Sequence, residues 1–365
     1  MTCYPRAPLG LRVLLPALVA VVLGFAGAVA GPAPAGAASA PRIVQLGDSY
    51  SAGNGTGDYT ETDCWRSPKN YGAQVARRIG ATYTNVACSG GVIADILQPR
   101  ALGSETTRTA TYVIDPAQYP DQEAQWQRRA REEHLCGVPT EPDLYYDLRM
   151  TSFVAAGSLA TGTAACQLMA RAQIDAVDRS TDLVFVTIGG NDLGFSTIVT
   201  QCLVLREPGG CRSALDGATA QAPAMMERTE AALAAVHAKS GGHAEIYLLS
   251  YPFLLNTDSY AIPEAAPTYD AGRGLRDLQV YGDQVQARGI QQLNAQGPDD
   301  FHFVDTVKAA WGGHEHGLDP RTVGDQSNAW LVPVGAPGRQ EAEWVHPTPD
   351  GWSATAEAVY AAVTG

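Results

Sequence analysis

Five short apolar or β-branched runs alternate with longer amphipathic segments along this chain. The runs span residues 42–46, 82–87, 182–188, 245–250 and 301–304, and each ends in turn-forming residues. Their length and composition predict five buried β-strands. The segments 70–79, 218–240 and 274–295 have apolar residues three to four positions apart, which predicts helices, and Pro223 is expected near the first turn of the second one. A closing helix is expected over 353–363.

Strand and helix alternation of this kind predicts an α/β fold in which helices cover both faces of one parallel sheet. Ligands of such sheets bind outside the carboxyl ends of the strands. In this chain, polar clusters directly follow the carboxyl ends of the predicted strands, among them Gly47-Asp48-Ser49 after the first run and Gly189-Gly190-Asn191-Asp192 after the third. We therefore expect the functional site at this edge of the sheet.

Two parts of the chain depart from the alternation. Residues 97–167 are rich in polar and turn residues, with five prolines, and we interpret them as an insertion in a single domain over 41–365. The insertion is either a lid or wall over the site or a surface excursion held by disulfides. In residues 1–40, Arg6 and Arg12 precede an apolar run from 13 to 30 and a stretch of small residues, which is typical of a secretory signal peptide.

Cleavage of the signal peptide is expected after Ala37 or Ala40, each of which follows a small-x-small pattern. The alternative is a retained membrane anchor, but no later stretch reaches the roughly 20 apolar residues that a membrane crossing requires. We expect a secreted, extracellular protein, a monomer without stable membrane insertion.

The composition narrows the function further. The chain of 365 residues is 45% hydrophobic and 17% charged, which suits a globular core. Removal of residues 1–40 takes away Arg6 and Arg12 but no acidic residue, and leaves 23 basic against 38 acidic residues. Nucleic acid is not expected as a partner, because binding its phosphates requires clustered Lys and Arg.

Six cysteines remain after the signal peptide is removed, and an even number in an exported chain predicts disulfides. Fifteen pairings are possible in principle. We favour the pairing that closes short loops: Cys64–Cys88, Cys136–Cys166 and Cys202–Cys211. The alternative is a zinc site, but no Cys-x-x-Cys pair occurs, and His314-Glu315-His316 lacks a third ligand. We expect no metal.

Nucleophilic catalysis needs a base beside the nucleophile and a group that orients the base. Ser49, presented by a glycine-assisted turn after the first strand, is the candidate nucleophile. His346 is the candidate base, and Glu343, three residues earlier, could accept a hydrogen bond from its ring. Taken singly, each has an ordinary structural interpretation, as a helix cap or a packing residue.

Acyl transfer also needs donors where negative charge develops on the carbonyl oxygen. The candidates are the backbone N–H groups of Ser49 and Gly90 and the side-chain amide of Asn191. The clusters around Ser49, Gly90 and Asn191 follow predicted strands, and the cluster around His346 comes last. Each cluster alone is a weak sign of catalysis, but the four in this order are a specific one.

In these four blocks the chain resembles the SGNH hydrolases, also called the GDSL esterase/lipase family, and especially its secreted, disulfide-containing bacterial members. The matching residues are Gly47-Asp48-Ser49-Tyr50-Ser51 with Gly53, then Gly90, then Gly190-Asn191-Asp192, and finally His346-Pro347. The family usually has Asp three residues before the His, where this chain has Glu343, and some secreted relatives use a backbone carbonyl instead.

The resemblance implies a three-layer α/β/α, flavodoxin-like fold and hydrolysis of a small-molecule or lipid carboxylic ester without a cofactor. It implies that Ser49 attacks, that His346 accepts the Ser49 proton, and that Ser49, Gly90 and Asn191 bind the oxyanion. The alternatives are a carbohydrate O-deacetylase that uses the same site and a non-catalytic binding module of the same fold.

Overall fold

A five-stranded parallel sheet forms the centre of the protein in the computed structural model, which describes residues 40–262, 268–322 and 326–365. The predicted signal peptide lies outside these residues except for Ala40. The strands are β1 (Arg42–Gly47), β2 (Thr82–Asn85), β6 (Leu183–Thr187), β7 (Glu245–Leu249) and β10 (Phe301–Val304). Their order is β10-β7-β6-β1-β2, and all pairs are parallel. The chain order reverses between β1 and β6, the switch point at which such sheets bind ligands.

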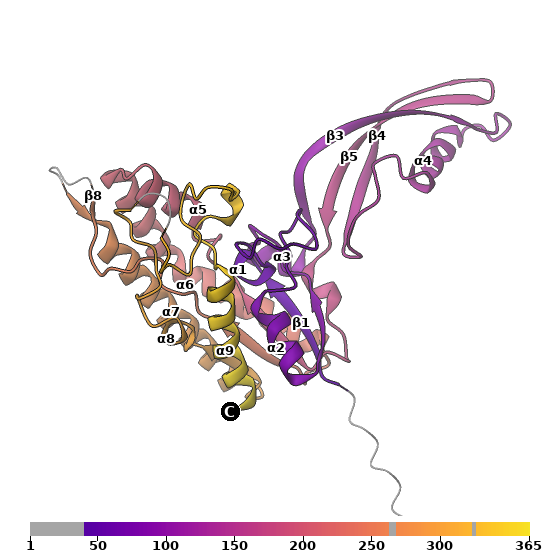
Figure 1. Cartoon of the computed structure of the whole chain (residues 1–365). Coiled ribbons are helices and arrows are strands. Elements are labelled where there is room, and N and C mark those ends of the chain that lie inside the picture. Colours follow the sequence, from indigo (N-terminus) through magenta and orange to yellow (C-terminus); the bar gives the residue numbers. More distant parts are fainter. Residues whose placement is uncertain (1–39, 263–267, 323–325) are drawn as a thin grey trace, which may run out of the picture. The chain divides into compact units, whose positions relative to one another are not determined.

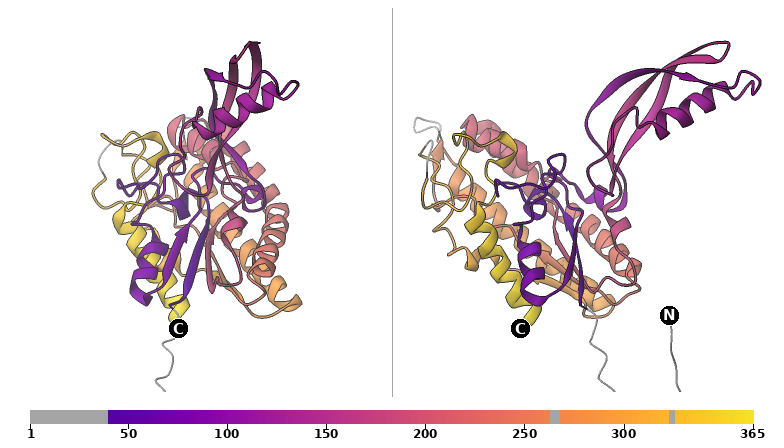
Figure 2. Two further views of the ribbon diagram at one scale, coloured as in Figure 1. Left: turned by 90° about the vertical axis from the view of Figure 1, so that its right-hand side faces the viewer. Right: turned by 45° about the vertical axis from the view of Figure 1, so that its right-hand side comes forward.

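Helices cover both faces of this sheet, as Figures 1 and 2 show. On one face lie α2 (Tyr71–Ile79), α8 (Val307–Ala310) and α9 (Pro349–Thr364); on the other lie α3 (Ile93–Leu97), α6 (Pro208–Lys239) and α7 (Ala271–Gln296). Alternate strand residues supply the two cores, because successive side chains of a strand point to opposite faces. Ile43, Phe185 and Tyr247 enter the first core, and Val44, Val184 and Ile246 enter the second. The predicted α/β/α fold class is confirmed.

The remaining elements are short or belong to a second sheet. They are α1 (Ser49–Ala52), β3 (Arg100–Val113), α4 (Gln122–Glu132), β4 (Leu144–Ala156), β5 (Leu159–Ala170), α5 (Phe195–Val199), β8 (Ala261–Ile262) and β9 (Tyr269–Asp270). Single turns of 3₁₀-helix span Gln173–Ala176 and Glu341–Glu343, and a π-helical turn spans Thr200–Val204.

Helix α6 begins ten residues before the predicted start at 218, so Pro223 lies well inside the helix and not in its first turn. Two adjacent glycines made this segment a poor helix candidate in the sequence. The structure supplies an N-terminal cap, in which the Glu207 carboxylate accepts hydrogen bonds from the N–H groups of Gly209 and Gly210. Pro208 occupies the first turn, where its missing N–H has no cost.

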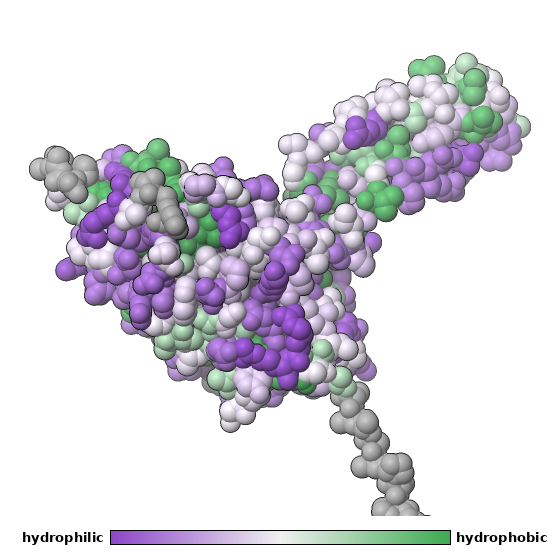
Figure 3. All heavy atoms as spheres, in the orientation of Figure 1, coloured by the Kyte–Doolittle hydropathy of each residue, from purple (hydrophilic) through white to green (hydrophobic). Residues whose placement is uncertain are grey.

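Within the segment interpreted as an insertion, the chain forms a three-stranded antiparallel sheet of order β3-β5-β4 with helix α4 against one face. Trp126 of α4 is fully buried there and packs closely against Gly162 of β5. The opposite face carries exposed threonines and, near the β4–β5 hairpin, the exposed apolar residues Val154 and Leu159. Figure 3 shows apolar surface at that end of the sheet.

Three disulfides join cysteines that follow one another along the chain: Cys64–Cys88, Cys136–Cys166 and Cys202–Cys211. The first links the loop after α1 to the end of β2, the second holds the segment after α4 to β5, and the third closes the chain before α6. Across the described ranges, no helix is both long enough and apolar enough to cross a membrane.

Candidate active site

Ser49 is the first residue of α1 and follows β1 after a single-residue turn at Asp48. Gly47 makes the turn possible, because its φ is 120° and an added Cβ would lie 2.2 Å from the Thr187 carbonyl oxygen. The serine is 5% exposed and lines a pocket. Its backbone N–H, at the open start of a helix, has no hydrogen-bond partner among the described residues.

The Asp48 side chain fixes this turn. One carboxylate oxygen accepts hydrogen bonds from the Tyr50 N–H (2.9 Å) and the Thr187 hydroxyl (2.8 Å), and the other accepts one from the Tyr251 hydroxyl (2.5 Å). Burial raises the pKa of Asp48 to about 6, although these three hydrogen bonds favour the ionised form. No pattern in the sequence pairs Tyr251 with this turn, since it lies 203 residues away along the chain.

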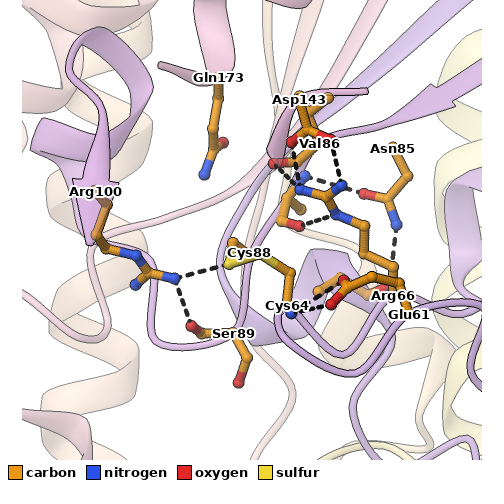
Figure 4. Close-up of polar contacts among 12 residues, drawn as sticks. Glu61, Cys64, Arg66, Asn85, Val86, Cys88, Ser89, Arg100, Asp143 and Gln173 are labelled. Carbon is orange, nitrogen blue, oxygen red and sulfur yellow. Dashed lines mark hydrogen bonds and ion pairs between the residues drawn. A yellow bond between two sulfur atoms is a disulfide. The ribbon is translucent and has the colours of Figure 1, made fainter. Parts of the chain in front are cut away.

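The turn that carries Gly90 is anchored on both sides. Cys88, two residues earlier, is bonded to Cys64, and the Arg100 guanidinium donates a hydrogen bond of 2.8 Å to the Ser89 carbonyl (Figure 4). Gly90 has a φ of 73°, in the left-handed region. Its N–H has no partner in the part of the chain that the structure describes, so it remains available as a donor.

A buried arginine holds the segment between β2 and the Gly90 turn. Arg66 makes two hydrogen bonds to the Asp143 carboxylate, at 2.7 and 2.6 Å, and donates to the carbonyl groups of Val86 and Ala87 at the end of β2 (Figure 4). The Arg66 side chain is 4% exposed and that of Asp143 is 20% exposed. The pair connects the disulfide loop to the base of strand β4.

Asn191 follows β6 and contacts the Gly90 turn directly. Its side-chain amide donates a hydrogen bond of 2.8 Å to the Gly91 carbonyl. The amide has a second N–H that this bond does not use. The Tyr251 hydroxyl accepts a hydrogen bond from the Gly190 N–H at 3.3 Å, so the same tyrosine contacts the Ser49 turn and the Asn191 turn.

His346 lies on a tightly held loop before α9. Its Nδ1 donates to the Trp344 carbonyl at 2.8 Å, which leaves Nε2 as the unprotonated ring nitrogen of the neutral imidazole. Nε2 is buried without a hydrogen-bond partner among the described residues, so it makes no hydrogen bond to Ser49 Oγ. Burial lowers the pKa of His346 to about 4, against the raising effect of the Trp344 and Glu343 backbone groups.

Strain next to this histidine shows how firmly the loop is fixed. Val345 has a φ of 56°, a conformation that costs a β-branched residue roughly 1–3 kcal/mol. Its N–H donates to the Val332 carbonyl at 2.7 Å, and its carbonyl accepts a hydrogen bond from the Tyr50 hydroxyl. The Tyr50 ring lies 5.0 Å from the His346 ring, between centroids.

The predicted contact between Glu343 and the imidazole is wrong. The Glu343 carboxylate accepts hydrogen bonds from the Tyr59 hydroxyl (2.6 Å), the Arg339 guanidinium (2.8 Å) and the Gln340 N–H (2.9 Å). Burial raises the pKa of Glu343, but these hydrogen bonds and the Arg339 charge outweigh it and lower the pKa overall. The group that orients His346 is the backbone carbonyl two residues before it.

Asn54 joins three of the four blocks, and sequence reasoning missed it. Its side-chain amide is fully buried and donates to the Ser89 hydroxyl (2.9 Å) and the Ala342 carbonyl (2.7 Å). The backbone carbonyl of Asn54 accepts a hydrogen bond from the Trp352 indole at 3.0 Å. In the sequence, Asn54 stands between Gly53 and Gly55, a pattern that predicts a turn and gives no sign of these contacts.

A mostly apolar pocket opens beside Ser49. It is lined by Ser49, Asn191, Tyr251, side chains of α7, and apolar residues such as Ile188, Leu193, Phe195, Ile198, Met225 and Leu254. None of the lining residues comes from the three-stranded sheet. Over the same described ranges, no group of three or more His, Cys, Asp and Glu side chains is placed to hold a metal ion.

Comparison with known proteins finds one family and several relatives. The family model for GDSL-like lipases and acylhydrolases matches residues 43–359. Lipase 2 of Streptomyces coelicolor is 27% identical over 353 residues, an alignment that covers 89% of this chain and 91% of that protein.

Two crystal structures have a similar fold. Phospholipase A1 from Streptomyces albidoflavus NA297 has a TM-score of 0.55 at 20% identity, with 90% of this chain and 100% of that one covered. The extracellular lipase of Streptomyces rimosus has a TM-score of 0.56 at 21% identity, with 89% and 100% covered.

Proposed function

Since the chain belongs to the GDSL-like lipase/acylhydrolase family and is a carboxylic ester hydrolase, we propose that Ser49 is its nucleophile and His346 its general base. One observation carries this proposal: Ser49 and Asn191 line one pocket, and the Tyr50 ring next to Ser49 packs against the His346 ring. A serine hydroxyl needs such a base because it is a poor nucleophile at its own pKa.

In the proposed reaction, the Ser49 oxygen attacks the ester carbonyl carbon while its proton passes to Nε2 of His346. The Trp344 carbonyl holds the Nδ1 proton, so Nε2 is the nitrogen that can accept. Collapse of the tetrahedral intermediate breaks the bond to the alcohol, which leaves with the proton from His346. Water then hydrolyses the acyl-enzyme by the same steps, with His346 as base again.

The oxyanion of each intermediate would be bound by the N–H groups of Ser49 and Gly90 and by the free amide hydrogen of Asn191. Two of these donors have no partner among the described residues, and the third lies on an amide that is already held in place by Gly91. Fixed donors are effective because they need no reorganisation as charge develops, and the loss of one typically lowers the rate about 10²–10³-fold.

The apolar lining of the pocket favours an ester with a hydrocarbon acyl chain over an acetyl group on a carbohydrate. An acetyl group would leave most of the lining without contact, whereas each buried CH₂ contributes roughly 0.8 kcal/mol. We therefore place esterase or lipase activity ahead of O-deacetylation.

The test is hydrolysis of p-nitrophenyl esters from acetate to palmitate by the mature protein, its Ser49→Ala variant and a control, Ser213→Ala, which removes an exposed hydroxyl from α6. We expect Ser49→Ala to lower kcat at least about 10³-fold and the control to match the wild type. Activity that survives in Ser49→Ala would assign the reaction to another nucleophile.

We also propose that the mature protein acts outside the cell as a monomer. Three disulfides support an oxidising compartment, and one structural relative is an extracellular lipase. N-terminal sequencing of the exported protein and light scattering after gel filtration test the two parts. A protein retained in the cell, or a stable dimer, would contradict them.

A further inference from the structure

The pocket beside Ser49 has lining residues from several strand ends along the carboxyl edge of the sheet, and its lining includes a pair of opposite charges, Asp283 and Lys308. One face of α7 forms a wall of it, through residues spaced three or four apart: Leu275, Leu278, Gln279, Gly282, Asp283 and Gln286. The wall is apolar at the start of this series and polar at its end. Lys308, in α8 after β10, also lines the pocket.

The strand order fixes the sequence of residues along the pocket. Ser49 follows β1, Asn191 follows β6, Tyr251 follows β7 and Lys308 follows β10. These strands are neighbours in that order, so the pocket crosses three inter-strand steps of about 4.8 Å each, or roughly 14 Å. Ser49 and Lys308 are therefore separated by three strand positions along the sheet edge.

Beyond the end of β10, the Lys308 ammonium donates a hydrogen bond of 2.6 Å to the Asp283 carboxylate and lies 5.3 Å from the centre of the Phe253 ring. The side chains of Lys308 and Asp283 are 11% and 23% exposed. Burial lowers the pKa of Lys308 and raises that of Asp283, which reflects how little water reaches the pair. A hydrocarbon chain placed on the pair would remove this water and supply no hydrogen bond in return.

We propose that the Asp283–Lys308 pair closes the acyl pocket and limits the substrate to medium-chain acyl esters, an inference that rests on the function proposed above. An extended hydrocarbon advances about 1.2 Å per bond, since three backbone bonds of an extended peptide span roughly 3.5 Å. A pocket of roughly 14 Å thus accepts about ten to twelve carbons before the chain reaches the charges. Longer saturated chains must bend out of the pocket or displace the pair.

The kinetic test compares kcat/KM for p-nitrophenyl octanoate, dodecanoate and palmitate in mixed micelles of one composition. The wild type should hydrolyse palmitate at least about tenfold less efficiently than octanoate, because palmitate would desolvate the pair. The double variant Asp283→Leu/Lys308→Met removes both charges together, so that no lone buried ion remains. It should raise the palmitate-to-octanoate ratio at least about tenfold.

Two controls separate this effect from a general change in stability. Lys308→Arg keeps a cation beside Asp283 and should keep the wild-type ratio. Arg78→Met/Glu357→Leu removes a surface ion pair between α2 and α9 and should also keep it. A double pocket variant with the wild-type ratio, or a wild type that hydrolyses palmitate as efficiently as octanoate, would overturn the proposal.

A binding measurement tests the same limit on acyl-chain length without turnover. Titration of Ser49→Ala with fatty-acid methyl esters of six to fourteen carbons should show affinity rising about fourfold per added CH₂ and then levelling at about ten to twelve carbons. Affinity that rises steadily to fourteen carbons would contradict the limit at the charged pair. If Ser49→Ala hydrolyses the esters, the proposed nucleophile fails, and the position of the plateau still tests the pocket.

Discussion

Replacement of Asp48 by Asn should shift the stability difference from the wild type in favour of the variant as the pH rises, although it removes a charged hydrogen-bond acceptor. The carboxylate is 2% exposed, and burial raises its pKa from 3.8 to about 6. A folded-state pKa above the unfolded value means that the folded state binds the proton more tightly. This contribution to stability is present in full below pH 3.8 and is lost as the pH rises through 6.

The shift of about two pKa units corresponds to about 3 kcal/mol, at 1.36 kcal/mol per unit. In the Asp48→Asn variant, the new amide oxygen could still accept from the Tyr50 N–H and the Thr187 hydroxyl, without an ionisation to titrate. The difference in unfolding free energy between Asp48→Asn and wild type should therefore grow in favour of the variant by about 2–3 kcal/mol from pH 4 to pH 8.

Urea unfolding of both proteins at intervals between pH 4 and pH 8 measures this difference directly. Groups that titrate in both proteins cancel, so only the growth of the difference with pH counts, and any constant effect of the amide drops out. A difference that stays constant over this range, or that moves in favour of the wild type as the pH rises, would refute the account of Asp48 as a buried, destabilised carboxylate.

Three further outcomes are expected from the geometry of the site. Glu343→Gln should change kcat/KM less than about threefold, while His346→Ala lowers it at least about 10³-fold; equal losses would show that the carboxylate orients the imidazole after all. The rate on a short-chain ester should fall as the pH is lowered, with an inflection near pH 4, because burial lowers the pKa of His346 to about 4 and the protonated ring cannot act as a base. An inflection at pH 6 to 7 would contradict this expectation and mean that the ring is hydrated before catalysis. Arg66→Met should lower the free energy of unfolding in urea by about 3–5 kcal/mol, since it leaves the Asp143 carboxylate unpaired. Arg78→Met, which removes an exposed ion pair, should lower it by less than about 1 kcal/mol, and similar losses in the two variants would contradict the role of burial.

Much of the central sheet could be predicted because buried parallel strands are short apolar runs bounded by turns. The segment with β3 to β5 was harder for a physical reason. Its exposed face repeats threonine at every second position, at Thr107, Thr109 and Thr111, which is a strand period without the apolar residues that usually reveal it. The early start of α6 depends on a Glu207 cap and a disulfide, neither of which the pattern of apolar residues contains.

At the candidate site, the polar residues at strand ends could be found from the sequence, whereas their supporting contacts could not. Tyr251 and Asn54 act through hydrogen bonds to turns that are distant in the chain, and no spacing rule encodes such contacts. The Glu343 prediction failed because sequence proximity to His346 does not show which side chains compete for its carboxylate. Tyr59 and Arg339 do so here.

If the chain is exported as proposed above, the order of the disulfides also bears on how it acquires its fold. The six cysteines of the described residues are bonded in three consecutive pairs, at separations of 24, 30 and 9 residues. A chain that crosses a membrane with its N-terminus first would present each correct partner before any later cysteine appears. Oxidation in order of emergence would then produce the native set directly, and a disulfide isomerase would have no wrong bond to correct.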